Sequence, residues 1–94
     1  MSRLPSVEVL TNAHTFPCAF VFKAIGSVEN DFVARVVAAV REVLAHDADP
    51  PHTLRHTSGG RHVAVTLEPR VQTAEEVLAV YRVIQQVRGL VMML

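Results

Sequence analysis

One segment, residues 16–26, constrains the fold of this 94-residue chain more than any other. It reads FPCAFVFKAIG, in which Phe20 and Phe22 alternate with Val21 and Lys23. This two-residue period is typical of a β-strand. A proline is tolerated at the start of a strand, and a glycine can adopt the positive φ of a tight turn, so Pro17 and Gly26 mark the two ends. The segment therefore predicts an aromatic-rich strand that turns directly into the next element.

A helix is predicted after this strand. Apolar residues recur three and four positions apart over residues 32–44 and form one stripe. Ser27 and Asn30 are both candidate N-caps, and Asp31 would place a negative charge in the first turn. Many of the apolar residues are valines, whose helix propensity is lower by a few tenths of a kcal/mol, but burying each one contributes roughly 1.5–3 kcal/mol. We therefore expect a buried helix, ended by the paired prolines Pro50 and Pro51.

A hairpin is predicted for residues 53–68. Gly59 and Gly60 can both take the positive φ that a two-residue primed turn requires. With that turn His56 pairs with Val63 and lies at the rim of an apolar face, whereas His62 points to the other face.

A second helix and a last strand follow the hairpin. Thr73 and Glu76 have the spacing of a capping box, and apolar residues continue at helical spacing over residues 77–87. Gly89 is placed for a left-handed C-cap. Residues 90–94 read LVMML and predict a strand that is apolar on both faces.

The order of elements is strand, helix, strand, strand, helix, strand. Right-handed crossovers leave one compact solution, an α+β ferredoxin-like sandwich with two helices on one face of a four-stranded antiparallel sheet in the order 4-1-3-2. We expect one domain over residues 16–94, preceded by a tail or lead-in over residues 1–15. The last strand is then an edge, and Val91, Met92 and Met93 are candidate interface residues.

Charge and cysteine content restrict the class of function. Nine Lys and Arg balance nine Asp and Glu, which argues against nucleic-acid binding because phosphate neutralisation needs a basic excess. A neutral, half-apolar chain lacks the charge repulsion that keeps small domains apart, so we expect a homo-oligomer, a homodimer in the simplest case. The single Cys18, the absence of a signal-peptide pattern and the absence of a membrane-spanning stretch predict a cytoplasmic protein.

Several of these segments together resemble a known family. Phe16-Pro17, Phe20 and Lys23-Ala24-Ile25-Gly26, with the turn Thr57-Ser58-Gly59-Gly60 and the spacing from Tyr81 to Leu94, are similar to the YbeD-like family of small bacterial proteins of unassigned function. The resemblance implies a ferredoxin-like domain similar to ACT-type regulatory domains, which bind amino acids, and it brings no catalytic residues. His62 and Val91 depart from the family pattern, which favours an aromatic and often a basic residue at these positions.

The sequence offers no catalytic or metal-binding motif, and we expect neither an enzyme nor a bound cofactor. The five histidines lack the tight Cys or His spacing of a structural zinc site. Cys18 in a strand is more often a small buried hydrophobe than a nucleophile.

Two functional hypotheses remain. The first is a non-enzymatic regulatory or protein-interaction module that self-associates through its sheet. The second is an ACT-type sensor of an amino acid or other small metabolite, which the turn after the first strand would bind. Lys23, Gly26, Ser27 and Asn30 are its candidate ligand-binding residues, because backbone donors at a helix N-terminus suit a carboxylate and Lys23 could hold an anion. Lys23 could equally extend into solvent from the open face of the sheet.

Overall fold

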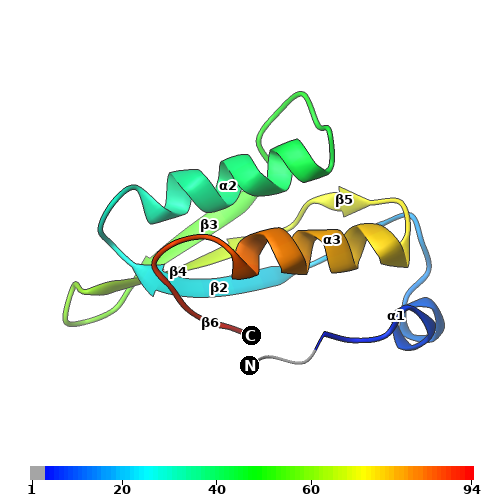
Figure 1. Cartoon of the computed structure of the whole chain (residues 1–94), viewed down its shortest axis with the longest axis horizontal. Coiled ribbons are helices and arrows are strands. Elements are labelled where there is room, and N and C mark those ends of the chain that lie inside the picture. The colour runs from blue at the N-terminus through cyan, green and yellow to red at the C-terminus, as the bar shows by residue number, and fades with distance from the viewer. Residues whose placement is uncertain (1–3) are drawn as a thin grey trace.

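The computed structural model describes residues 4–94 and confirms the predicted α+β class. Its helices are α1 (Val7–Ala13), α2 (Phe32–Val43) and α3 (Ala74–Gln85). Its strands are β1 (Cys18–Ala19), β2 (Phe22–Ser27), β3 (His52–His56), β4 (His62–Leu67), β5 (Arg70–Val71) and β6 (Leu90–Met93). Helices α2 and α3 lie side by side against one face of the main sheet (Figure 1).

The main sheet has the predicted topology. Strands β3, β4, β2 and β6 are adjacent in that order, and every neighbouring pair is antiparallel. This is the predicted order 4-1-3-2 read from the other edge, so the ferredoxin-like arrangement is confirmed. Within residues 4–94, β3 and β6 are the two edges of the sheet.

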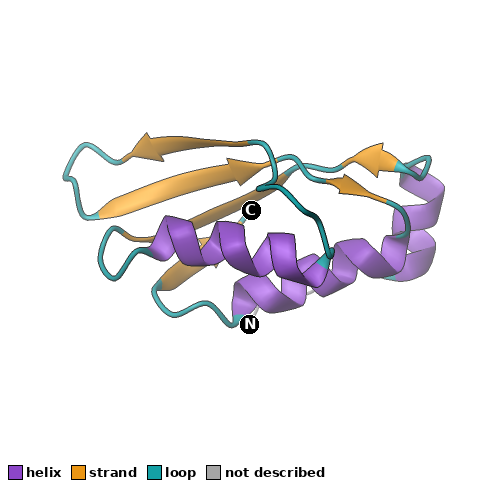
Figure 2. Ribbon diagram, turned by 90° about the horizontal axis from the view of Figure 1, so that it is seen from above, coloured by secondary structure: helices purple, strands orange, loops and turns teal. Residues whose placement is uncertain are grey.

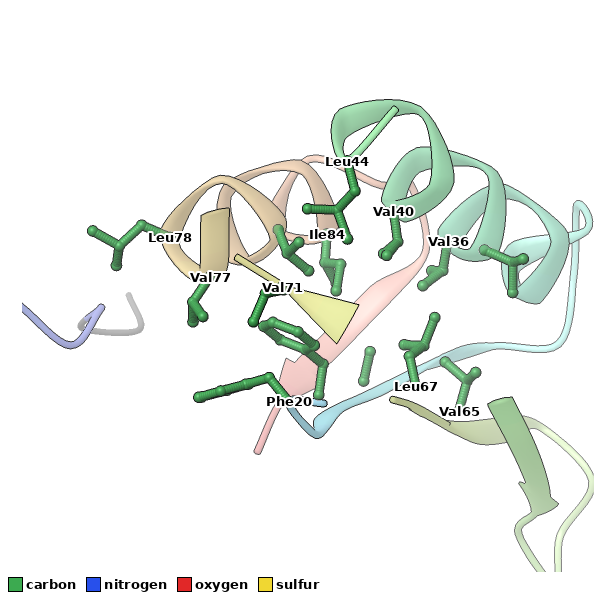
Figure 3. Close-up of a cluster of buried hydrophobic side chains, with 14 of the residues drawn as sticks. Phe20, Val36, Val40, Leu44, Val65, Leu67, Val71, Val77, Leu78 and Ile84 are labelled. Carbon is green, nitrogen blue, oxygen red and sulfur yellow. The ribbon is translucent and has the colours of Figure 1, made fainter. Parts of the chain in front are cut away.

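The core lies between this sheet and the two long helices (Figure 3). Phe22 and Ala24 of β2 and alternate residues of β4 point toward the helices and are buried, as the two-residue period predicts. The labelled side chains of Figure 3 include Val36, Val40 and Leu44 from the α2 side and Val77, Leu78 and Ile84 from α3.

The prediction of one continuous first strand was wrong. The chain forms two strands, β1 and β2, that belong to different sheets: β1 pairs with β5, and β2 lies in the main sheet. The Phe20 N–H at the break donates to the Pro69 carbonyl (3.0 Å). The alternating pattern could not reveal this change of partner, because both strands bury side chains in the same core.

The turn from β2 to α2 also differs from the prediction. Gly26 lies inside β2 and does not have a positive φ; Asn30 (φ 59°) and Asp31 (φ 55°) make the left-handed turn, and Asp31 is the N-cap. Gly26 is needed for a different reason: a Cβ at this position would lie 2.3 Å from Cζ of the Phe32 ring. Close packing, rather than turn geometry, therefore requires the glycine.

Helix α2 ends in a Schellman motif. The Ala45 N–H donates to the Glu42 carbonyl (3.1 Å) and the His46 N–H to the Arg41 carbonyl (3.0 Å). Ala45 occupies the left-handed position (φ 54°), where glycine is usual. The helix thus ends before the two prolines that were predicted to stop it.

The hairpin has the predicted register but a different turn. His56 lies opposite Val63, as predicted. The Gly60 N–H donates to the Thr57 carbonyl (2.9 Å), and of the two turn glycines only Gly60 has a positive φ (73°). The turn therefore spans residues 57–60 instead of consisting of Gly59 and Gly60 alone.

Helix α3 begins at its predicted cap. The Thr73 hydroxyl accepts a hydrogen bond from the Glu76 N–H (3.2 Å), while Glu76 accepts from the N–H of Gln72, not of Thr73. Gly89 has a positive φ (98°) but lies beyond the C-cap residue Gln86, where the chain turns into β6. The predicted glycine C-cap is therefore wrong, although the left-handed conformation is present.

The N-terminal segment, predicted as a tail or lead-in, contains helix α1. The Ser6 hydroxyl caps it by accepting from the Val9 N–H (3.1 Å), and Leu10 is buried in the core. Residues 1–3 of that segment lie outside the described residues.

Candidate functional site

Strand β6 presents an exposed apolar edge. Val91 and Met92 expose 58% and 47% of their surface, and Leu94, just past the strand, exposes 63%. Met93 instead packs against the core from the edge of the inner face. Of the three predicted interface residues, two are thus accessible and one mainly supports the fold, while Leu94 was missed because its exposure depends on where the strand ends. Their role in an interface stays a prediction.

Backbone groups at this edge are available for pairing. The Leu94 N–H donates to the Lys23 carbonyl (2.9 Å), so Leu94 directs its hydrogen bond toward β2. In an antiparallel ladder these directions alternate along the strand, which leaves the Met93 N–H facing away from β2. No strand among residues 4–94 covers that side of β6.

The two edges of the sheet differ in chemistry. Strand β6 has the sequence LVMM and carries no charge, whereas β3 has the sequence HTLRH. Within the four strands of the main sheet the charged residues are Lys23 and Arg55, accompanied by three histidines and no Asp or Glu. The sheet is therefore cationic, although the whole chain is neutral.

A groove runs between helix α2 and strand β3. Its volume is about 680 Å³, within the range of small-ligand pockets. The outer flank of α2, with Ala34 and Ala38, forms one wall, and His52 and His56 of β3 lie on the other. The groove exists because the helices cover β4 but not β3: alternate β4 residues are buried, while all five β3 residues are exposed. In Figure 2 the hairpin of β3 and β4 lies beside the helices.

An ion pair lies at one end of the groove. Arg41 Nη1 of α2 lies 2.6 Å from Asp49 Oδ1 of the following loop. His52 Nδ1 lies 2.8 Å from the Pro50 carbonyl oxygen, which orients that ring at the same end. Sequence reasoning missed the groove, since α2 and β3 contribute to it from separate parts of the chain.

The predicted ligand-binding residues do not form one cluster. Lys23 is exposed on the open face of the sheet, whereas Gly26 points toward the helices and contacts Phe32. The Ser27 hydroxyl accepts from the Glu29 N–H (3.1 Å), and the Asn30 carbonyl accepts from Arg35 Nε (2.8 Å). The turn is therefore held by its own hydrogen bonds, and a ligand role for these residues stays a prediction.

Arg35 links this turn to the segment between α3 and β6. Besides Asn30 it contacts the Arg88 carbonyl oxygen through Nη2 (2.8 Å). The Ser27 N–H donates to the Gly89 carbonyl (2.9 Å), and the Val28 N–H donates to the Arg61 carbonyl (3.1 Å). The N–H groups of Ser27 and Val28 therefore already donate hydrogen bonds within the chain.

Other reactive side chains have ordinary surroundings. Cys18 is half-buried and packs against the core. No group of three or more His, Cys, Asp or Glu side chains placed to hold a metal ion occurs within residues 4–94. Burial raises the pKa of Tyr81, which packs edge-on against Phe22 with ring centroids 5.1 Å apart. No helix in the described part of the chain is both long and apolar enough to cross a bilayer.

Comparisons with known proteins give one consistent result. A family model described as "Protein of unknown function (DUF493)" matches residues 11–94. A "UPF0250 protein" of Shewanella oneidensis is 31% identical over 74 residues, which cover 79% of this chain and 82% of the relative. A "UPF0250 protein" of Neisseria gonorrhoeae is 35% identical over 68 residues, covering 71% of this chain and 74% of the relative.

Proposed function

The chain belongs to the DUF493 family of proteins of unknown function, as its YbeD-like sequence pattern predicted, and we propose that it is a non-enzymatic regulatory or protein-interaction module. Its first partner is a second copy of itself, bound edge to edge through β6. The observation that carries this proposal is the uncharged, exposed edge formed by Val91, Met92 and Leu94.

The alternative edge supports this choice by contrast. Natural sheets protect their edges with charged or polar side chains, and β3 carries Arg55 and two histidines. Strand β6 has no such protection. Antiparallel pairing of two β6 strands about a two-fold axis would satisfy their outward backbone groups and continue each sheet into its partner.

Pairing through β6 also hides apolar surface. Val91, Met92 and Leu94 are each about half exposed or more, so the partner strand would remove part of this surface from water. The contact area of a single strand is small, and we expect a dimer whose population depends on concentration in the micromolar range or above.

An ACT-type sensor is the second interpretation. The turn from β2 to α2 would be its ligand site, but the N–H groups of Ser27, Val28 and Glu29 already donate to acceptors within the chain, which leaves only the N–H groups in the first turn of α2 as backbone donors. We therefore favour the interaction module. Because a ligand that binds only the folded state must raise its stability, a thermal-shift panel of millimolar amino acids separates the two functions.

The proposal is tested by the mass in solution, measured by light scattering over a range of concentrations. We expect the mass to approach twice the 10.3 kDa of one chain and Met92→Lys to return it to that of a monomer. Leu54→Lys is the matched control, because Leu54 lies on the other edge with a similar exposure of 49%. A wild-type protein that stays monomeric at millimolar concentration, or a Met92→Lys variant that still dimerises, would refute the proposal.

A further inference from the structure

Strand β3 is an edge strand that the rest of the described chain leaves uncovered. It pairs with β4 on one side only, and all five of its residues are exposed. The Thr57 N–H donates to the His62 carbonyl (3.0 Å), and the alternation of an antiparallel ladder then directs the N–H groups of Arg55 and Thr53 toward β4 as well. The N–H groups of His52, Leu54 and His56 consequently face outward, where they could donate hydrogen bonds to an added strand.

The groove against α2 lies along this same edge. On the helix side it extends from Asp31 to Arg41, which is about 15 Å at 1.5 Å per residue. On the strand side it extends from His52 to His56, about 13 Å at 3.3 Å per residue. The two walls match in length, so an extended segment of four or five residues alongside β3 would direct every second side chain into the groove.

The chemistry of the groove indicates which side chains these are. Between Asp31 at one end and Arg41 at the other, the wall from α2 is built from small and apolar residues, including Ala34, Val37 and Ala38, and the floor includes Val63 of β4. The Arg41 charge at one end is already paired with Asp49. The groove therefore suits small or medium apolar side chains.

The opposite face of β3, on the open side of the sheet, favours acidic side chains on an added strand. Arg55 pairs with Ala64, whose neighbours in β4 are buried under the helices, so Arg55 points to the open face. None of the carboxylates in residues 4–94 forms an ion pair with Arg55, and the four strands of the sheet contain no acidic residue. An acidic side chain on an added strand would meet this cation across the new strand pair.

We propose that the β3 edge and its groove bind a second type of partner, an extended acidic peptide segment that alternates apolar and acidic residues. The segment adds to the sheet as a fifth strand, with apolar side chains in the groove and acidic side chains beside Arg55. This site is independent of the β6 edge, so self-association and peptide binding can succeed or fail separately.

The probe is a labelled nonapeptide that alternates glutamate with valine, with a lysine–valine peptide of equal length as its comparison. We expect saturable binding of the acidic peptide by fluorescence anisotropy, with amide shifts in NMR spectra confined to β3 and the groove side of α2. Arg55→Glu should weaken this binding at least tenfold and should reverse the preference so that the lysine peptide binds better. The charge reversal is the main readout, because Arg55 is exposed and its replacement leaves the core intact.

A backbone test complements the charge test. Leu54→Pro removes the central outward N–H at an edge position where proline is tolerated, and Leu54→Ala removes the side chain but keeps the N–H. We expect the proline variant alone to abolish binding. Equal binding of both peptides to the wild type, amide shifts at β6 instead of β3, or no binding at millimolar peptide would each overturn the proposal.

Discussion

The contact between Gly26 and Phe32 gives the sharpest prediction about the fold. A Cβ built at Gly26 would lie 2.3 Å from Cζ of Phe32 and 2.5 Å from both Cε atoms, far inside any observed Cβ contact. Phe32 is 1% exposed, so its ring is enclosed by neighbouring residues and cannot turn freely into solvent. Gly26→Ala must therefore displace either the strand or the ring, at the point where β2 meets α2.

The magnitude follows from this geometry. Overpacking a close-packed core by one methyl group costs about 1–3 kcal/mol, and three short contacts with a confined ring place this site in the upper part of that range. The lower backbone entropy of the unfolded alanine chain offsets only about 0.4–1 kcal/mol. We expect the free energy of unfolding to fall by about 2 kcal/mol and the melting temperature to fall by roughly 8–16 °C for a domain of this size.

Urea unfolding followed by circular dichroism measures this change. Gly59→Ala is the matched control, because nothing lies within 4 Å of a Cβ there and its φ is not positive. It should raise the free energy of unfolding by about 0.4–1 kcal/mol, since only the lower entropy of the unfolded chain changes. Adding Phe32→Leu to Gly26→Ala should cost less than the sum of the two single changes, since the smaller side chain makes room for the methyl group. If Gly26→Ala is as stable as Gly59→Ala, the packing argument fails.

Three further predictions concern local features. Ala45→Gly relieves the left-handed alanine of the Schellman motif (φ 54°) and should raise the free energy of unfolding by about 0.5–1 kcal/mol; an unchanged urea midpoint would contradict this reasoning. Thr73→Ala removes the hydroxyl that accepts from the Glu76 N–H and should lower the free energy of unfolding by about 1 kcal/mol. Thr73→Ser keeps a hydroxyl at the cap and should retain most of the wild-type stability. Tyr81 is the single tyrosine, and its pKa, followed by ultraviolet absorbance, should lie above 10.0 in the folded protein. Because Tyr81 ionises at a lower pH in the unfolded chain than in the folded one, the free energy of unfolding should fall as the pH rises above 10.0. Tyr81→Phe should remove the part of this pH dependence that is due to Tyr81.

Much of the fold could be predicted because local and long-range signals agree. The same element order is indicated by the helical stripes over residues 32–44 and 77–87, by the Thr73 cap and by the hairpin register. The preference for right-handed crossovers then leaves one topology. The errors arose where a residue serves a partner distant in sequence. Gly26 looks like a turn residue, but it is required by the ring of Phe32, and the break after β1 depends on pairing with β5.

The candidate sites were predictable to a smaller extent. The apolar edge could be found because Val91 and Met92 follow from strand order alone. The groove could not, because its depth depends on how far α2 extends over the hairpin, a distance that no sequence period encodes. The cationic character of the sheet was likewise hidden by the neutral total charge.

The most direct test of the central claim, pairing through β6, is disulfide crosslinking between copies. Single cysteines are introduced in turn at residues 90–94 in a Cys18→Ser background, with Leu54→Cys as the control on the other edge. Pairing about a two-fold axis predicts efficient crosslinking at one position of β6, where a residue lies opposite its own copy, and none at Leu54. A cysteine two positions from that point is displaced along the strands by four residues, about 13 Å, from its copy, which is beyond disulfide distance. No crosslinking along β6, or equal crosslinking at every position and at Leu54, would contradict it.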